Sequence, residues 1–235
     1  MMPVLVDFGV IKIYTMSVFV VLAFLWAGFV VSKKAREYHL GEVEIYDGGV
    51  ISLITIWVFD KLLVYFSLQN LSLLGLWAAV LIGAVIVAKR ENANLFTVFD
   101  LFSMGLMMAL AWWSLGLFWS GTPVGRQRFV PVELLSGVMY LMGFIFLWLV
   151  EGKYRTFPWY RGRRSSANTG FLFGSALTIF GIVVMTGELM SKVVTRERLF
   201  LSVLGMVMGV FVIYLRSERV LKQDLRAMVD KVRWR

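Results

Sequence analysis

The chain has 235 residues, of which 59% are hydrophobic and 17% are charged, and its mean hydropathy is +0.77. A soluble domain carries about 25% charged residues, so this composition excludes an ordinary water-soluble core. The sequence has no cysteine and one histidine, His39, which excludes a disulfide framework or thiolate metal site and gives no support to a histidine metal site. The net charge of +9 comes from basic residues between apolar runs, which points to a membrane surface rather than to nucleic acid.

Seven stretches are long and apolar enough, or nearly so, to span a bilayer. A helix rises 1.5 Å per residue, so about 30 Å of hydrocarbon needs roughly 20 apolar residues. Backbone groups in lipid must bond to one another, and these runs lack the alternation of a barrel, so we expect helices. The first run is too long to be a removed signal peptide. The runs cover residues 13–32, 48–66, 70–88, 95–119, 130–150, 169–190 and 199–215.

The distribution of Lys and Arg predicts the orientation. The segments after the first, third, fifth and seventh runs hold 17 of the 24 basic residues, and the opposite segments hold 5. Because basic loops stay in the cytoplasm, we expect an all-α integral membrane protein of about seven transmembrane helices. Its N-terminus would be outside and its C-terminus cytoplasmic.

One polytopic domain, residues 1–216, is predicted, followed by a basic tail, residues 217–235. The longest loop, 151–168, is too short to form a second domain. Apolar residues recur in the tail near helical spacing, with Lys and Arg between them. The tail would form either an amphipathic helix on anionic lipid or a solvated extension of the seventh helix.

Ionisable side chains inside the apolar runs are the candidate functional residues. A charge within a span costs about 2.5–3.5 kcal/mol on insertion scales, so such a residue is expected to have a functional role or a charged partner. Lys61, Glu133 and Glu188 lie at similar depth near the predicted external side and are the candidate catalytic residues, with Asp60 beside the first. The alternative is that they form interhelical ion pairs or sit at the membrane interface.

Other conspicuous residues have structural explanations. Asp100, near the start of the fourth run, would favour the positive end of that helix's dipole, and His39 would be solvated in a loop. Two glycine pairs, Gly170/Gly174 and Gly205/Gly209, have the spacing that lets helices approach closely. An aromatic belt at the interface would account for the residues crowding the end of the fourth run, which are Trp112, Trp113, Phe118 and Trp119.

Local matches to one family follow in order along nearly the whole chain. Ile13 and Tyr14 open the first run as a Trp-Tyr-Gly motif would, a basic stretch at 33–36 follows it, and an acidic stretch at 42–44 precedes the second run. On these residues the chain resembles the prolipoprotein diacylglyceryl transferases, bacterial enzymes that move diacylglyceryl from phosphatidylglycerol to the cysteine thiol of a lipoprotein precursor. The resemblance implies the same seven spans and the same orientation.

The positions that match the family's motifs lack its reactive side chains. Gly75 matches the second residue of a His-Gly-Gly-Leu motif, but Leu74 replaces the histidine. The signature Arg-x-Gly-Asn-Phe-x-Asn-x-Glu matches residues 114–122, where Gly116 and Phe118 keep the frame. Its arginine, two asparagines and glutamate are replaced by Ser114, Leu117, Ser120 and Thr122.

The resemblance implies a bacterial cytoplasmic membrane, phosphatidylglycerol as lipid partner and a lipoprotein precursor as possible protein partner. No cofactor, metal or nucleic acid is expected. Candidate lipid-binding residues are Tyr14, Lys61, Ser114, Arg126 and Arg128. Leucine supplies no proton acceptor and serine no cation, and losing one such group costs about 100-fold or more in rate.

Three functions stay open. We expect a catalytically silent relative that keeps a lipid-binding cavity; the alternatives are an active transferase with a rearranged site and a small transporter or channel subunit. For a transporter, discontinuous helices or paired repeats would be expected, and the sequence shows neither.

Overall fold

The computed structural model describes residues 3–7, 12–65, 72–121, 131–162, 165–191 and 194–217. This part of the chain is mostly helical, and each of the seven apolar runs coincides with one long helix. The elements are β1 Val4–Asp7, β2 Lys12–Tyr14, α1 Thr15–Glu37, α2 Glu42–Tyr65, α3 Ser72–Arg90, α4 Leu95–Ser120, α5 Val132–Glu151, a 3-10 turn Tyr154–Thr156, α6 Pro158–Arg161, α7 Phe171–Met190 and α8 Arg196–Arg216.

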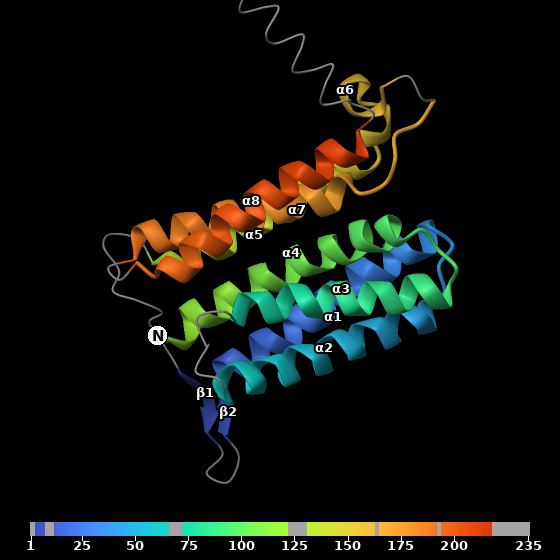
Figure 1. Ribbon diagram of the computed structural model, residues 1–235. Helices are drawn as coiled ribbons and strands as arrows, with labels where there is room; N and C mark the ends of the chain where they lie inside the picture. Colours follow the sequence, from blue (N-terminus) through green and yellow to red (C-terminus); the bar gives the residue numbers. More distant parts are fainter. Residues whose placement is uncertain are drawn as a thin grey trace, which may run out of the picture.

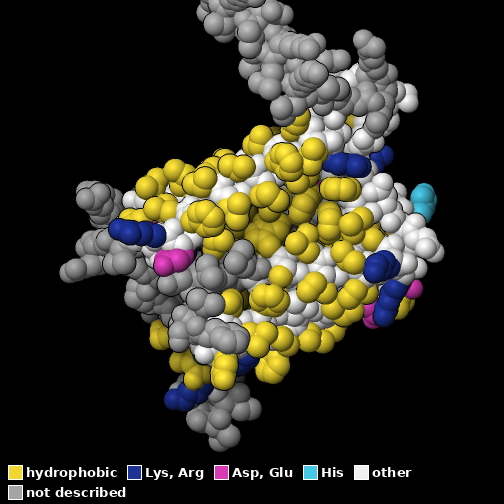
Figure 2. All heavy atoms as spheres, viewed as in Figure 1, with side chains coloured by type: hydrophobic (Ala, Val, Ile, Leu, Met, Phe, Trp, Pro, Cys, Tyr) yellow, Lys and Arg dark blue, Asp and Glu magenta, His cyan; other side chains and the backbone are white. Residues whose placement is uncertain are grey.

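Among the described residues, five helices are long and apolar enough to cross a membrane, namely α1, α4, α5, α7 and α8. The space-filling view shows hydrophobic side chains covering the middle of the bundle, with charged side chains gathered toward its two ends (Figure 2). A polytopic helical membrane protein is therefore confirmed at this level. The predicted tail falls, apart from Ser217, outside the described residues.

The long helix α4 is the centre of the bundle. It packs against α1, α3, α5 and α7, and α7, α8 and α5 form a layer beside the one made by α1, α2 and α3 (Figure 1). Local sequence sets its ends: the Asn94 side chain accepts a hydrogen bond from the Phe96 N–H at 3.0 Å, and Gly121 stops the helix with φ of 69°.

The two ends of the helix bundle carry different elements, and we name each end by the element that it carries. At the ribbon end, β1 and β2 form a short antiparallel ribbon that leads directly into α1. The helices α4 and α7 finish at this end, and α5 and α8 begin there. The opposite end, the α6 end, carries the 3-10 turn and α6 between α5 and α7 (Figure 1).

Glycines bring α7 and α8 into close contact. A Cβ on Gly174 would lie 2.8 Å from the carbonyl oxygen of Gly209, and a Cβ on Gly181 would lie 2.5 Å from that of Ser202. Close helix packing was predicted for Gly174 and Gly209, and they face each other. Gly170 has another role: it precedes α7 with φ of 114°, a conformation that suits glycine.

Candidate functional site

Glu188 at the ribbon end is a paired structural carboxylate. It lies in the last turn of α7, is 6% exposed, and accepts hydrogen bonds from the Thr195 N–H at 3.0 Å and from Nη1 of Arg198 at 3.3 Å. These bonds tie the end of α7 to the residues that begin α8. The interhelical ion pair that we gave as the alternative for the buried charges thus describes Glu188.

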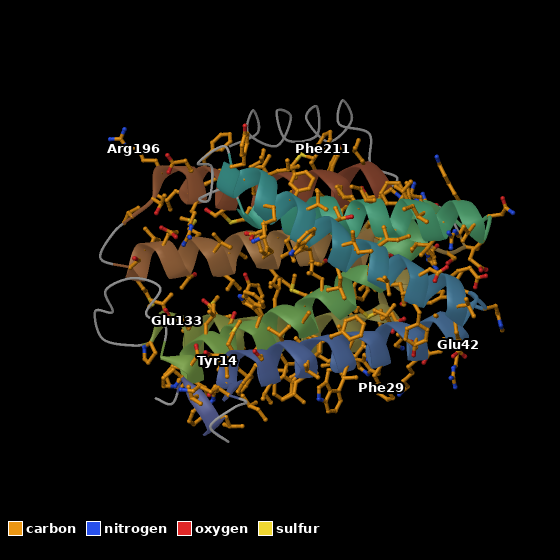
Figure 3. The ribbon with its side chains drawn as sticks, turned by 90° about the horizontal axis from the view of Figure 1, so that it is seen from below. Tyr14, Phe29, Glu42, Glu133, Arg196 and Phe211 are labelled. Carbon is orange, nitrogen blue, oxygen red and sulfur yellow. The ribbon has the colours of Figure 1, made fainter. Side chains whose placement is uncertain are left out.

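Glu133 lies close to the same place, on the neighbouring helix. It is in the first turn of α5, is 5% exposed, and lies near the ribbon end (Figure 3). A carboxylate there is favoured by the positive end of the helix dipole. The ends of the two helices touch, because a Cβ on Gly187 would lie 3.3 Å from Cγ1 of Val132.

The third candidate, Lys61, is on a different part of the bundle. It lies late in α2 and is exposed, as is Asp60 beside it. The helix α2 packs mainly against α3, with a smaller contact to α1, whereas Glu133 and Glu188 come from the packed pair α5 and α7. The structure therefore gathers the two glutamates and leaves Lys61 on the outer surface of another helix.

The positions matching the family signature serve helix packing. Gly116 lets α1 approach α4, because a Cβ there would lie 2.6 Å from Cβ of Phe19. Ser114 is buried, and Oγ of Ser120 donates to the backbone oxygen of Leu117 at 3.0 Å. The ring of Phe118 meets that of Trp119 edge-on, with centroids 5.6 Å apart.

The remaining predicted residues are placed in part. Gly75 brings α3 against Phe59 of α2, since its Cβ would lie 3.0 Å from Cβ of Phe59. Tyr14 precedes α1 at the ribbon end and is about half exposed (Figure 3). Only the backbone of Leu74 is described. The predicted residues Thr122, Arg126 and Arg128 lie outside the described part of the chain.

The most developed polar site is at the α6 end, around Asp100. This side chain is 2% exposed; its Oδ1 accepts from the Phe173 N–H at 2.8 Å, and its Oδ2 accepts from the Gly170 N–H at 2.7 Å. These are free N–H groups of the first turn of α7. Our interpretation of Asp100 as a dipole partner of its own helix is corrected by this geometry: it caps α7 instead.

A tyrosine from the 3-10 turn completes the Asp100 site. The Tyr154 hydroxyl donates to Oδ2 of Asp100 at 3.3 Å, and its ring stacks on Phe171 at 5.4 Å. Burial, followed by the negative charge of Asp100, raises the pKa of Tyr154 to about 12. The neutral phenol therefore acts as a donor that positions the carboxylate.

A second buried charge cluster joins α1 to α5 at the same end. Nζ of Lys34 lies 2.5 Å from Oε2 of Glu151 and 2.7 Å from Oε2 of Glu37, and both Lys34 and Glu151 are 7% exposed. The Tyr38 hydroxyl donates to Oε1 of Glu151 at 3.0 Å. Sequence reasoning missed this cluster because each charge lies where an apolar run meets a loop.

His39 is exposed after α1, in the loop where a solvated role was expected.

Comparison of the chain with protein-family models and with curated proteins finds no match.

Proposed function

We propose that the chain crosses a bacterial cytoplasmic membrane seven times, with the ribbon end external and the α6 end cytoplasmic. In the described part of the chain, long helices coincide with all seven apolar runs, and the basic residues follow the odd-numbered runs. A reporter fused after Arg216 tests this orientation: a cytoplasmic reporter should be active there and a periplasmic one silent. The reverse pattern would overturn the proposal.

We further propose that the protein is a non-transferring relative of the prolipoprotein diacylglyceryl transferases that holds phosphatidylglycerol at its external end. This proposal is supported above all by the structural roles of the residues that match the family signature. Gly116 and Ser120 are engaged in helix packing and in a bond to the backbone of their own helix. Neither supplies a proton acceptor for a thiol or a cation for a departing glycerol phosphate.

The buried carboxylates at the ribbon end support the same conclusion. Transfer would need a base and a cation around one substrate. Glu188 is occupied by Arg198 and by the Thr195 N–H, and Lys61 is exposed on α2. Tyr14 and the aromatic residues near the end of α4 remain available for contact with lipid, since Tyr14, Trp113 and Trp119 are each about half exposed.

An active transferase with a rearranged site is the second candidate. It is favoured by one observation: two buried glutamates, Glu133 and Glu188, come from packed helices at the same end. In this alternative Glu133 would act as the base, and Arg126 or Arg128, just before it in the sequence, would hold the phosphate.

A transfer assay separates the two candidates. Purified protein in phosphatidylglycerol vesicles is given a peptide with a lipoprotein cleavage motif, and thioether-linked diacylglyceryl is measured by mass spectrometry. We expect no product above protein-free vesicles, while phosphatidylglycerol copurifies with the protein. Product that disappears in Glu133→Ala but persists in Lys61→Ala would establish the alternative; absence of copurified phosphatidylglycerol would remove the lipid-holding role.

A further inference from the structure

The segment between α5 and α7 carries charge of one sign. Between Gly152 and Gly170 the sequence contains Lys153, Arg155, Arg161, Arg163 and Arg164, and no Asp or Glu. The described part of this segment forms the 3-10 turn and α6 at the α6 end of the bundle (Figure 1). The nearest acidic residue in the sequence is Glu151, which precedes Gly152 and pairs with Lys34.

Three cations at the α6 end that lie outside this segment have carboxylate partners. Lys34 pairs with Glu151, Arg36 with Glu42 at 2.6 Å, and Arg90 with Asp47 at 2.5 Å. These pairs engage the carboxylates of Glu151, Glu42 and Asp47 with cations of α1 and α3.

Arg155 and Arg161 lack such a partner within the described residues. The guanidinium of Arg155 lies over the rings of Tyr38 and Tyr154, with centroids at 5.7 and 5.9 Å. Nε of Arg161 is buried and, in the part of the chain that the structure describes, has no hydrogen-bond acceptor. The positive charges of Arg155 and Arg161 are therefore not matched by a carboxylate in the part of the chain that the structure describes.

Aromatic packing holds α6 against the start of α7. The ring of Tyr160 is 1% exposed and meets Phe171, the first residue of α7, at 5.1 Å. Phe157 and Trp159 stack at 6.1 Å, and Trp159 remains 47% exposed. An exposed tryptophan beside basic residues is typical of a surface at the headgroup level of a bilayer.

We propose that Lys153, Arg155, Trp159 and Arg161 form a binding surface for the phosphate of an anionic phospholipid. The guanidinium fork matches two phosphate oxygens, basic groups near a membrane attract anionic lipid, and Trp159 contacts the glycerol and upper acyl region. This surface is at the end of the bundle opposite the lipid position of the proposed function. It is therefore independent of that function and of any transfer chemistry.

Native mass spectrometry of the full, delipidated protein in detergent tests the surface. Phosphatidylglycerol or phosphatidylcholine is titrated in, and the lipids retained per chain are counted. The test variant is Arg155→Gln/Arg161→Gln. The control is Arg36→Gln/Lys89→Gln, which removes the same charge from exposed residues at the same end. Inorganic phosphate is added as a competitor, because a site for a free ion would release the lipid whereas a lipid surface would not.

We expect the wild-type protein and the control to retain one more phosphatidylglycerol than the test variant. The dissociation constant of that lipid should rise about 30-fold, which corresponds to about 2 kcal/mol for two cations near a lipid surface. Arg155→Lys/Arg161→Lys should keep most of the binding. If the double variant loses helical content, the single variant Arg161→Gln is tested in its place. This substitution breaks no hydrogen bond of Nε within the described residues.

Four results would overturn the proposal: unchanged retention in the test variant, an equal loss in the control, equal retention of phosphatidylcholine, or release of the lipid by inorganic phosphate. Because the transfer assay and the ribbon-end lipid are measured separately, failure here leaves the proposed function standing. Failure of the proposed function likewise leaves this surface standing.

Discussion

Nζ of Lys34 in α1 lies 2.5 Å from Oε2 of Glu151 in α5, and both side chains are 7% exposed. A buried ion pair contributes little net stability compared with apolar packing, but breaking it leaves a buried charge without its partner. The pair therefore joins two helices that are far apart in the sequence, and it makes each of its residues sensitive to substitution.

Lys34→Met should destabilise the protein by about 3 kcal/mol, because Glu151 would remain buried and, among the described residues, would keep the Tyr38 hydroxyl as its one partner. Lys33→Met is the matched control: Lys33 is exposed and lies over the Trp148 ring at 5.1 Å, so its loss should cost about 1 kcal/mol or less. Denaturant unfolding in detergent, followed by circular dichroism, measures both. Equal costs would show that the pair has no special role.

Asp100→Leu should cost about 2–5 kcal/mol, because two N–H groups in the first turn of α7 lose their acceptor in a buried site. Asp100→Asn keeps one acceptor oxygen and should fall between Leu and the wild type. The control is Ser103→Ala, one turn further along α4, whose hydroxyl bonds within the described structure to the backbone oxygen of Phe99 in its own helix. Hydrogen exchange at Gly170 and Phe173 should speed up in Asp100→Leu alone, and protection that persists would contradict the cap.

Gly209→Ala should weaken the packing of α7 on α8 by about 1–3 kcal/mol, since the new Cβ would lie 2.5 Å from the carbonyl oxygen of Gly174. Gly205→Ala provides the comparison on the same helix: its Cβ would meet nothing closer than 3.5 Å. There alanine should be neutral or stabilising by about 0.5–1 kcal/mol through helix propensity. Thermal unfolding in detergent ranks the two variants, and the reverse order would refute this close contact between the helices.

The stability of the folded protein should fall between about pH 10 and pH 12. The pKa of Tyr154 is raised to about 12 by burial and then by the charge of Asp100, while an unfolded tyrosine titrates near 10. Within that window the unfolded chain has lost a proton that the folded chain keeps, so high pH favours unfolding; below pH 10 both forms are neutral and the contribution is complete.

Tyr154→Phe should reduce that loss by up to about 1.4 kcal/mol per pH unit, the value for one proton. Burial raises the pKa of Tyr38 and of Tyr160 as well, so part of the dependence should remain in the variant. Denaturant titrations at closely spaced pH values provide the slopes. Identical slopes in both proteins would show that Tyr154 ionises equally in the two states.

The helices could be predicted from the sequence because hydropathy is a local property. The run at 95–119 and the helix α4 Leu95–Ser120 nearly coincide. The run at 48–66, by contrast, missed the start of α2, which begins at Glu42. Hydropathy detects the part of a helix that would lie in hydrocarbon, whereas Glu42 and Glu44 favour the helix through its dipole outside that layer.

The polar contacts could be predicted only in part. The position of a residue along its apolar run predicts its depth in the membrane, and on this basis Glu133 and Glu188 were placed at one end. Depth does not indicate which side of a helix faces a neighbouring helix. Lys61 was therefore grouped with the two glutamates although it lies on the exposed side of α2. The Asp100 hydrogen bonds join residues 70 and 73 positions apart in the sequence. No local sequence pattern indicates a contact between residues so far apart. For Lys34 and Glu151 the sequence did contain a usable indication of pairing, namely opposite charges at the same predicted depth in the membrane.

The cap that α4 provides for α7 also sets an order of assembly. During synthesis Asp100 enters the membrane long before Gly170 and Phe173 emerge from the ribosome, and until they arrive two of its three described donors are missing. The early helices thus carry an unmet acceptor that the late helices satisfy. A nascent chain stopped before residue 170 would be a natural substrate for membrane quality control.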